Sequence, residues 1–142
     1  GVFGGGYDGS GASNMMDYVT IATTGNATDF GDLTVARYQF GACSSTTRGI
    51  WMGGNDNSNS TNVIDYITIA TTGNATDFGD TTGNTERNAC CSNGERGVSG
   101  GGHNGSSKIN IIQYVTIATT GDATDFGDLT QTRSGPGSCS GE

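Results

Sequence analysis

The chain has 142 residues, 26 of them Gly and one of them Pro, with a formal net charge of −8 and a pI near 4.2. Its six basic residues stand singly along the sequence, which argues against nucleic acid as a partner because a binding surface needs clustered positive charge. No run of 18 apolar residues is present, so we expect no membrane insertion, and the near absence of proline excludes a collagen-like chain.

A 16-residue phrase occurs three times and dominates the sequence. It reads DYVTIATTGNATDFGD from Asp17, returns as DYITIATTGNATDFGD from Asp65, and appears as QYVTIATTGDATDFGD from Gln113. The spacing is 48 residues both times, which is typical of a repeat architecture. We therefore predict repeats at 1–48, 49–96 and 97–142. Together they form one repeat domain that belongs to a longer chain or to an oligomer.

The first repeat begins with three predicted strands. Val2–Phe3 is a short apolar strand that runs into glycines, and a polar tip follows it. Met15–Thr23 is a longer strand, rich in Val, Ile, Thr and Tyr. The turn residues Thr24-Gly25-Asn26 then lead into a returning strand at Ala27–Leu33, as in a hairpin.

A connection at 34–40 and a small-residue strand at Gly41–Ser45 complete the repeat. Each repeat thus has four short strands and no segment with helical periodicity, so we predict an all-β fold. In the longest strand, apolar side chains occur on both faces, with Met16 and Tyr18 on one and Val19 and Ile21 on the other. This pattern predicts a sheet that is covered on both sides.

Three of the four cysteines occupy one equivalent position, because Cys43, Cys91 and Cys139 are 48 residues apart. They are either small buried thiols at a tight packing position or partners in disulfides within or between subunits. Their spacing does not match a CxxC metal site, and the two aspartates of each hairpin, such as Asp29 and Asp32, are too few ligands for calcium. No metal and no cofactor is expected.

The repeats resemble kelch repeats, in which a strand ends in a double glycine. The matching segments are Phe3-Gly4-Gly5, Met52-Gly53-Gly54 and Ser99-Gly100-Gly101. The chain departs from the kelch pattern where a Trp usually stands near the start of the outer strand, because Phe30, Phe78 and Phe126 lie there instead. The resemblance implies a β-propeller with one four-stranded blade per repeat. The alternatives are a β-trefoil and an open repeat stack.

Three blades are fewer than the four to eight with which propellers typically close. Closure therefore requires further repeats of the parent chain or a second copy in a homo-oligomer, and an open stack would form a filament instead. We expect ring closure.

A narrower resemblance concerns the phrase TIATTGNATDFGDLT together with the RG and GGG motifs. It is similar to repeats in structural and tail-fibre proteins of marine bacteriophages, including those that infect cyanobacteria. This resemblance implies a virion surface or fibre role, outside the cell. We therefore expect a non-enzymatic structural or recognition module. The alternatives are a purely structural fibre or assembly protein and a trefoil-type lectin.

Two sets of loops vary between the repeats while the hairpin phrase hardly changes. In kelch propellers these two sets meet on one face, which the resemblance implies for this chain too. We take that face as the candidate surface for recognising a host glycan or protein receptor. Tyr, Asn, Asp and Ser suit this role because they make adaptable hydrogen bonds. The candidate binding residues are Tyr7, Asp8, Arg37, Tyr38, Asn55, Asp56, Glu86, Arg87, His103, Asn104 and Arg133. No catalytic residue is expected, because the only histidine has no companion motif.

Overall fold

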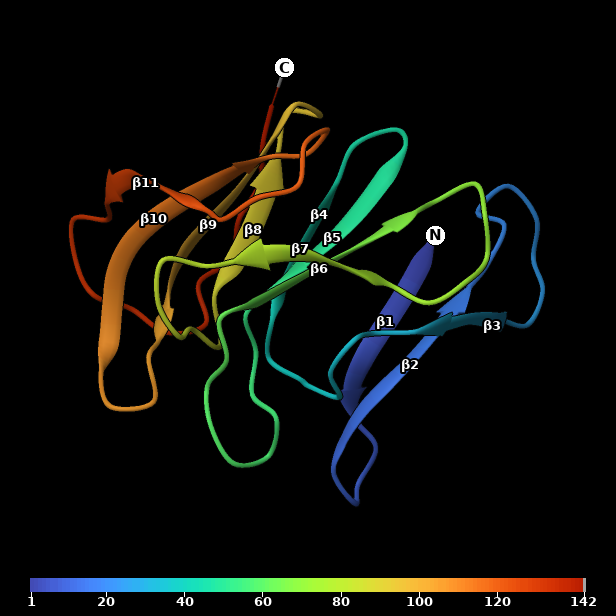
Figure 1. The fold of residues 1–142 in the computed structure, drawn as a ribbon, viewed down its shortest axis with the longest axis horizontal. Coiled ribbons are helices and arrows are strands. Elements are labelled where there is room, and N and C mark those ends of the chain that lie inside the picture. Colours follow the sequence, from blue (N-terminus) through green and yellow to red (C-terminus); the bar gives the residue numbers. More distant parts are fainter. Residues whose placement is uncertain (142) are drawn as a thin grey trace.

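The computed structural model describes residues 1–141, which form eleven strands and no helix. The predicted all-β fold is confirmed. Three antiparallel sheets stand side by side in chain order, as Figure 1 shows from the blue strands through the green to the orange ones. Within the described residues there is no helix of the length and apolar character that crossing a membrane would require.

The strands of each sheet follow one another along the chain. The first sheet contains β1 (Val2–Tyr7), β2 (Ala12–Tyr18) and β3 (Thr28–Asp32). The second sheet contains β4 (Gly41–Ser44), β5 (Arg48–Met52), β6 (Val63–Thr68) and β7 (Thr76–Asp80). The third sheet contains β8 (Ala89–Ser92), β9 (Arg96–His103), β10 (Lys108–Thr116) and β11 (Thr124–Asp128).

The second and third sheets each take their first strand from the preceding sequence repeat. β4 pairs with β5 so that Gly41 lies opposite Met52, and β8 pairs with β9 so that Ala89 lies opposite Gly100. Among the described residues the first sheet has no equivalent strand, so one edge of β1 is unpaired. The sheets are therefore out of phase with the 48-residue repeats by one strand.

The predicted second strand differs from the structure at both ends. β2 begins at Ala12 and ends at Tyr18, whereas the sequence predicted Met15–Thr23. The strand ends early because a β-turn follows, in which the Thr23 N–H donates to the Thr20 carbonyl at 3.1 Å. The same turn closes the equivalent strands in the later repeats, through Thr71 and Thr119.

The second sheet is buried on both faces, as predicted from the apolar residues on both faces of the repeated strand. Trp51 and Ile67 pack on one side against Met16, Phe30 and Leu33 of the first repeat. On the other side, a second cluster joins the second sheet to the third. It consists of Ile50, Met52, Ile64, Phe78, Val115 and Ile117. Two apolar layers thus separate three sheets, and their burial is the main stabilising contribution to the fold.

Small residues let β4 of the second sheet approach β8 and β9 of the third sheet closely. A Cβ placed on Gly41 would lie 2.3 Å from the Cys90 sulfur, and one on Gly97 would lie 2.7 Å from the Cys43 sulfur. The Ser92 hydroxyl also donates to the Ser44 carbonyl at 2.5 Å. This contact explains why the predicted small-residue strand contains Gly, Ala, Cys and Ser.

Candidate functional site

The loops that follow β1, β5 and β9 project from the same side of the molecule, at the bottom of Figure 1. We call their turns at 8–11, 56–59 and 104–107 the tips. The tips and the connections at 33–40, 81–88 and 129–136 make up the loop face. The turns between β4 and β5 and between β8 and β9 lie at the opposite ends of the strands.

One side chain shapes each tip by accepting hydrogen bonds from the backbone of its own turn. Asp8 Oδ1 accepts from the N–H groups of Ser10 and Gly11, at 2.8 and 3.0 Å, and Asp56 Oδ1 accepts from those of Ser58 and Asn59, at 2.9 and 2.8 Å. Asn104 does the same in the third tip. These three candidate binding residues therefore hold the loops in place as Asx turns.

Hydrogen bonds in these turns also change the acidity of the two carboxyl groups. The Ser10 hydroxyl, together with the backbone N–H groups of Ser10 and Gly11, lowers the pKa of Asp8. The N–H groups of Asn59 and Ser58 lower the pKa of Asp56. Because both shifts are downward, these bonds favour the turns above the ordinary carboxyl pKa and lose that effect as the pH falls below it.

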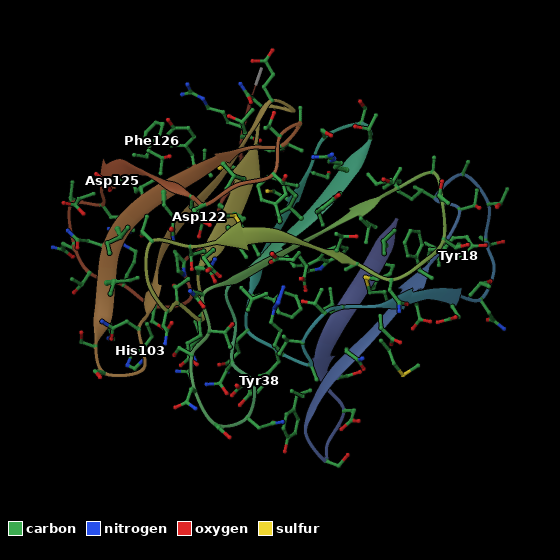
Figure 2. The ribbon with its side chains drawn as sticks, in the orientation of Figure 1. Tyr18, Tyr38, His103, Asp122, Asp125 and Phe126 are labelled. Carbon is green, nitrogen blue, oxygen red and sulfur yellow. The ribbon has the colours of Figure 1, made fainter. Side chains whose placement is uncertain are left out.

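Backbone bridges tie each connection to the loop of the following repeat. Tyr38 and Asn55 exchange two N–H···O bonds of 3.0 and 2.8 Å, and Glu86 and His103 exchange two of 2.9 and 2.8 Å. The expectation that the two variable loop sets meet on one face therefore agrees with the geometry. Figure 2 shows Tyr38 and His103 on this lower side.

Glu86 is the centre of a polar cluster on the loop face, although only 6% of it is exposed. The Asn55 amide donates to Glu86 Oε2 at 2.5 Å, and Arg87 Nε lies 4.0 Å from Oε1. His103 Nδ1 lies 3.6 Å from Oε1 and accepts a hydrogen bond from the Gly105 N–H. Three candidate residues from the second and third repeats thus converge on the carboxylate of a fourth.

An aromatic pair stands beside this cluster. The rings of Tyr7 and Tyr38 meet edge to face with centroids 5.4 Å apart, and Tyr7 is 60% exposed. Exposed tyrosines offer a partner both apolar area and a hydroxyl group. The pair and the Glu86 cluster provide the chemistry of the loop face.

Arg37 must be removed from the binding candidates. Its side chain is completely buried, and Nη2 forms a 3.0 Å salt bridge with Asp65, which is also completely buried. The Thr34 backbone N–H and hydroxyl donate to the same carboxylate. Burial lowers the pKa of Arg37, and the negative charge of Asp65 opposes that shift. Arg37 therefore joins the first sheet to the second and cannot reach a ligand on the surface.

Arg133 lies away from the polar cluster. It is exposed and lines a shallow groove on the open side of the third sheet with Val98, Ile112 and Leu129. The structure therefore separates it from the candidate residues that converge around Glu86.

The four cysteines are free thiols in the structure, with Cys139 exposed and the other three half-buried. Burial, assisted by the neighbouring Cys91, raises the pKa of Cys43 to about 12. Burial also raises the pKa of Cys90. Both thiols therefore stay neutral and weakly reactive near neutral pH, and for Cys43 this fits the packing interpretation of its position.

The double glycines lie at the ends of the strands that carry the loop face and help to shape it. The residues that form the equivalent pairs differ from those predicted. The equivalent pairs are Gly5-Gly6, Gly53-Gly54 and Gly101-Gly102, and all six residues have φ between +60 and +118°. A Cβ on Gly53 would lie 2.3 Å from the Thr85 carbonyl oxygen. Glycine is therefore required both by the left-handed backbone and by the close approach of the connection. The pairs predicted for the first and third repeats, Gly4-Gly5 and Gly100-Gly101, thus begin one residue too early.

Two residues that shape the loop face were missed in the sequence. Asn57, with φ of 82°, accepts a hydrogen bond from the Ala12 N–H and so links the first two tips. Gln39 accepts from Arg87 Nε at 3.1 Å, and its backbone carbonyl accepts from the Arg87 N–H. The tolerance of Asn for left-handed backbone was an available signal for the first, whereas nothing local marked the second.

Within residues 1–141 no group of three or more His, Cys, Asp or Glu side chains is arranged to hold a metal ion. No protein-family model and no curated protein sequence matches this chain.

Proposed function

We propose that the chain is a non-enzymatic recognition module of a phage tail fibre or virion surface, and that its loop face binds a host glycan or protein receptor. The observation that carries this proposal is that the constant and the variable residues of the repeats lie in different parts of the structure. The constant hairpin phrase supplies Phe30, Phe78 and Ile67 to the apolar layers, whereas variable residues such as Tyr7, Asn55 and His103 lie together on the loop face. The resemblance to marine phage proteins supplies the setting.

The fold that supports this proposal is a set of kelch-like propeller blades. Antiparallel sheets packed face to face, left-handed double glycines at the strand ends, and a first strand taken from the preceding repeat all fit such blades. A trefoil would be a closed monomer without exposed strand edges, whereas β1 has an unpaired edge. That edge favours the propeller over the trefoil.

The loop face has the chemistry of an adaptable binding surface. It offers the exposed Tyr7 packed against the half-buried Tyr38, a buried carboxylate fixed by Asn55, and amide and hydroxyl groups on the three tips. Aromatic rings stack on apolar faces of sugars or side chains, and the polar groups fix orientation. The Asx turns hold the tips in shape before binding, which lowers the entropic cost of association.

Binding of the 142-residue chain to arrays of bacterial surface glycans and to whole marine cyanobacterial cells tests the proposal. We expect binding that falls at least tenfold in the variant Tyr7→Ala with His103→Ala. A matched control, Thr46→Ala with Glu95→Ala, alters exposed residues at the opposite ends of the strands and should bind normally. Absence of binding to every target, or equal binding by both variants, would refute the proposal.

A purely structural role in fibre assembly is the second candidate. It is favoured by the exposure of large apolar side chains on the two outer sheets, namely Phe3 at 66% and Phe126 at 56%. This candidate predicts an ordered oligomer without a soluble ligand, so a stable monomer in sedimentation experiments would count against it.

A further inference from the structure

The two boundaries between sheets are built from the same contacts, displaced by 48 residues. At the first boundary the Gly73 N–H donates to the Phe30 carbonyl at 2.7 Å, and at the second the Gly121 N–H donates to the Phe78 carbonyl at 2.7 Å. The side-chain oxygen Oδ1 of Asn74 also accepts a hydrogen bond from the Asp32 N–H, and Oδ1 of Asp122 accepts one from the Asp80 N–H. One interface design is therefore used twice within the chain.

Each outer sheet presents one half of that interface without a partner. Phe126 is 56% exposed, whereas the equivalent Phe30 and Phe78 are 3% and 2% exposed. Figure 2 shows Phe126 at the outer flank of the third sheet. On the first sheet, Ile21 is 84% exposed, whereas the equivalent Ile117 is 1% exposed. Within the described residues, the third sheet thus has no following sheet and the first sheet has no preceding one.

The charges at the boundaries match when the third sheet is placed against a first sheet. The first boundary contains the buried pair Arg37 and Asp65. At the second boundary the equivalent residues are Thr85 and Gln113, so both charges are absent together. At a boundary between a third and a first sheet the same two positions hold Arg133 and Asp17, which are again opposite in charge.

A strand is also available for the unpaired edge of β1. The segment Gly137–Ser140 is equivalent to β4 and β8, and it already lies beside β8, because the Ser138 and Ser140 hydroxyls donate to the Cys90 and Ser92 carbonyls at 2.7 Å. It lies in no sheet of the described structure. The registers of β4 with β5 and of β8 with β9 would place Gly137 opposite Gly4 and Cys139 opposite Val2.

We propose that two copies of this chain associate head to tail, each adding its strand 137–140 to the β1 edge of the other and packing its third sheet on the other's first sheet. Arg133 then pairs with Asp17 of the second copy, and Phe126 is covered by the β1–β2 sheet. Because the contact is made twice, both outer faces and both edges are satisfied, and six sheets close into one ring.

A second copy is the favoured occupant because it offers the missing halves in the correct order. The Arg133 and Asp17 match is charge complementarity between two surfaces of the same chain, and the new contact continues the interface design of the two internal boundaries. Residues 1–141 do not close on themselves, because the first and third sheets lie on opposite flanks of the second (Figure 1). This inference does not depend on the proposed receptor binding.

Light scattering on a sizing column tests the association directly. We expect twice the chain mass of 14.4 kDa at micromolar concentration. Asp17→Arg should give single chains with unchanged circular dichroism, and adding Arg133→Asp to that variant should restore the double mass. The control Asp77→Arg makes the same charge change at a position that is exposed in all three repeats, and it should remain a dimer. A monomeric or filamentous wild type, or equal masses for Asp17→Arg and Asp77→Arg, would overturn the proposal.

A disulfide trap tests the register even if a charge variant fails to fold. Val2→Cys should be oxidised to a disulfide with the native Cys139 of the other copy, since opposing residues in antiparallel strands lie within disulfide reach. Mixing isotope-labelled with unlabelled chains shows by peptide mass whether the linked peptides come from different chains. Phe3→Cys is the control, because its register partner is Ser138. Absence of the 2–139 link, or an equal yield from Phe3→Cys, would overturn the proposed strand pairing.

Discussion

The pair of Arg37 and Asp65 is the clearest residue-level feature that joins the sheets. Both side chains are completely buried, and two nitrogen atoms of Arg37, Nε and Nη1, have no hydrogen-bond partner among the described residues. A buried ion pair of this kind often contributes little net stability, yet removing one member leaves an uncompensated charge. The chain itself contains a neutral version of the same site, because Thr85 and Gln113 occupy the equivalent positions.

This comparison leads to a prediction for a double-mutant cycle. Arg37→Thr alone should lower the free energy of unfolding by about 3–5 kcal/mol, because Asp65 would remain buried without its cation. Adding Asp65→Gln should recover most of that loss, since Thr82 shows that the backbone N–H and hydroxyl at this position donate equally well to a Gln oxygen. Urea unfolding at one fixed protein concentration measures both values.

The exposed Lys108 supplies the control for this cycle. Lys108→Thr should change the free energy of unfolding by less than about 0.5 kcal/mol, as is usual at exposed positions. If the double variant is as unstable as the sum of the two single variants, the pair is not the cause of the loss.

At the scale of elements, glycines in the outer strands permit one hairpin to reach over the preceding sheet. Gly79 has φ of 141°, and a Cβ there would lie 2.6 Å from the backbone carbonyl carbon of Gly121. Gly127 has almost the same backbone conformation, with φ of 138°, but a Cβ there would meet no atom within 4 Å. A comparison of Gly79 with Gly127 therefore distinguishes the energetic cost of backbone strain from that of steric contact.

We therefore predict different costs for the same substitution. Gly127→Ala should cost about 1–3 kcal/mol from strain alone, whereas Gly79→Ala should cost at least about 1 kcal/mol more, because the hairpin must also move. Urea unfolding in the Asp17→Arg background, where single chains are expected, measures the difference without any contact from a second copy. Equal losses would mean that the contact between Gly79 and Gly121 has no energetic effect.

The sequence predicted the elements well where the signal is local. The 48-residue period follows from the repeated phrase. The all-β class and the two-sided burial of the second sheet follow from Val, Ile and Tyr spacing, and the structure agrees. It could not predict that β4 and β8 join the next sheet, because pairing depends on long-range contacts. Arg37 was misassigned for the same reason, since its partner Asp65 is close only in the fold.

At the scale of the whole molecule, the three sheets have the same interface design but only two completed boundaries. The exposed Phe3 and Phe126 and the unpaired β1 edge belong to the two halves of a third boundary, which is not completed within the described residues. The loop face depends on this point, because each completed boundary adds one bridge between a connection and the following loop, such as Tyr38 with Asn55. In the proposed dimer, Ser134 would form that bridge with Tyr7 of the second copy, which would extend the face around the ring.

The stability of the molecule should consequently depend on its concentration. When folding is coupled to association, a tenfold dilution removes about 1.4 kcal/mol per dimer, which corresponds to a fall of about 2–4 °C in the thermal midpoint. Scanning calorimetry over a hundredfold range of concentration measures this shift. Asp17→Arg should unfold at a midpoint that does not change with dilution.

In the wild type, alkylation of Cys139 should slow as the concentration rises, because association would place this thiol where Cys91 is half-buried in the third sheet. A midpoint and a Cys139 reactivity that are both independent of concentration would show that the outer sheets stay open in solution.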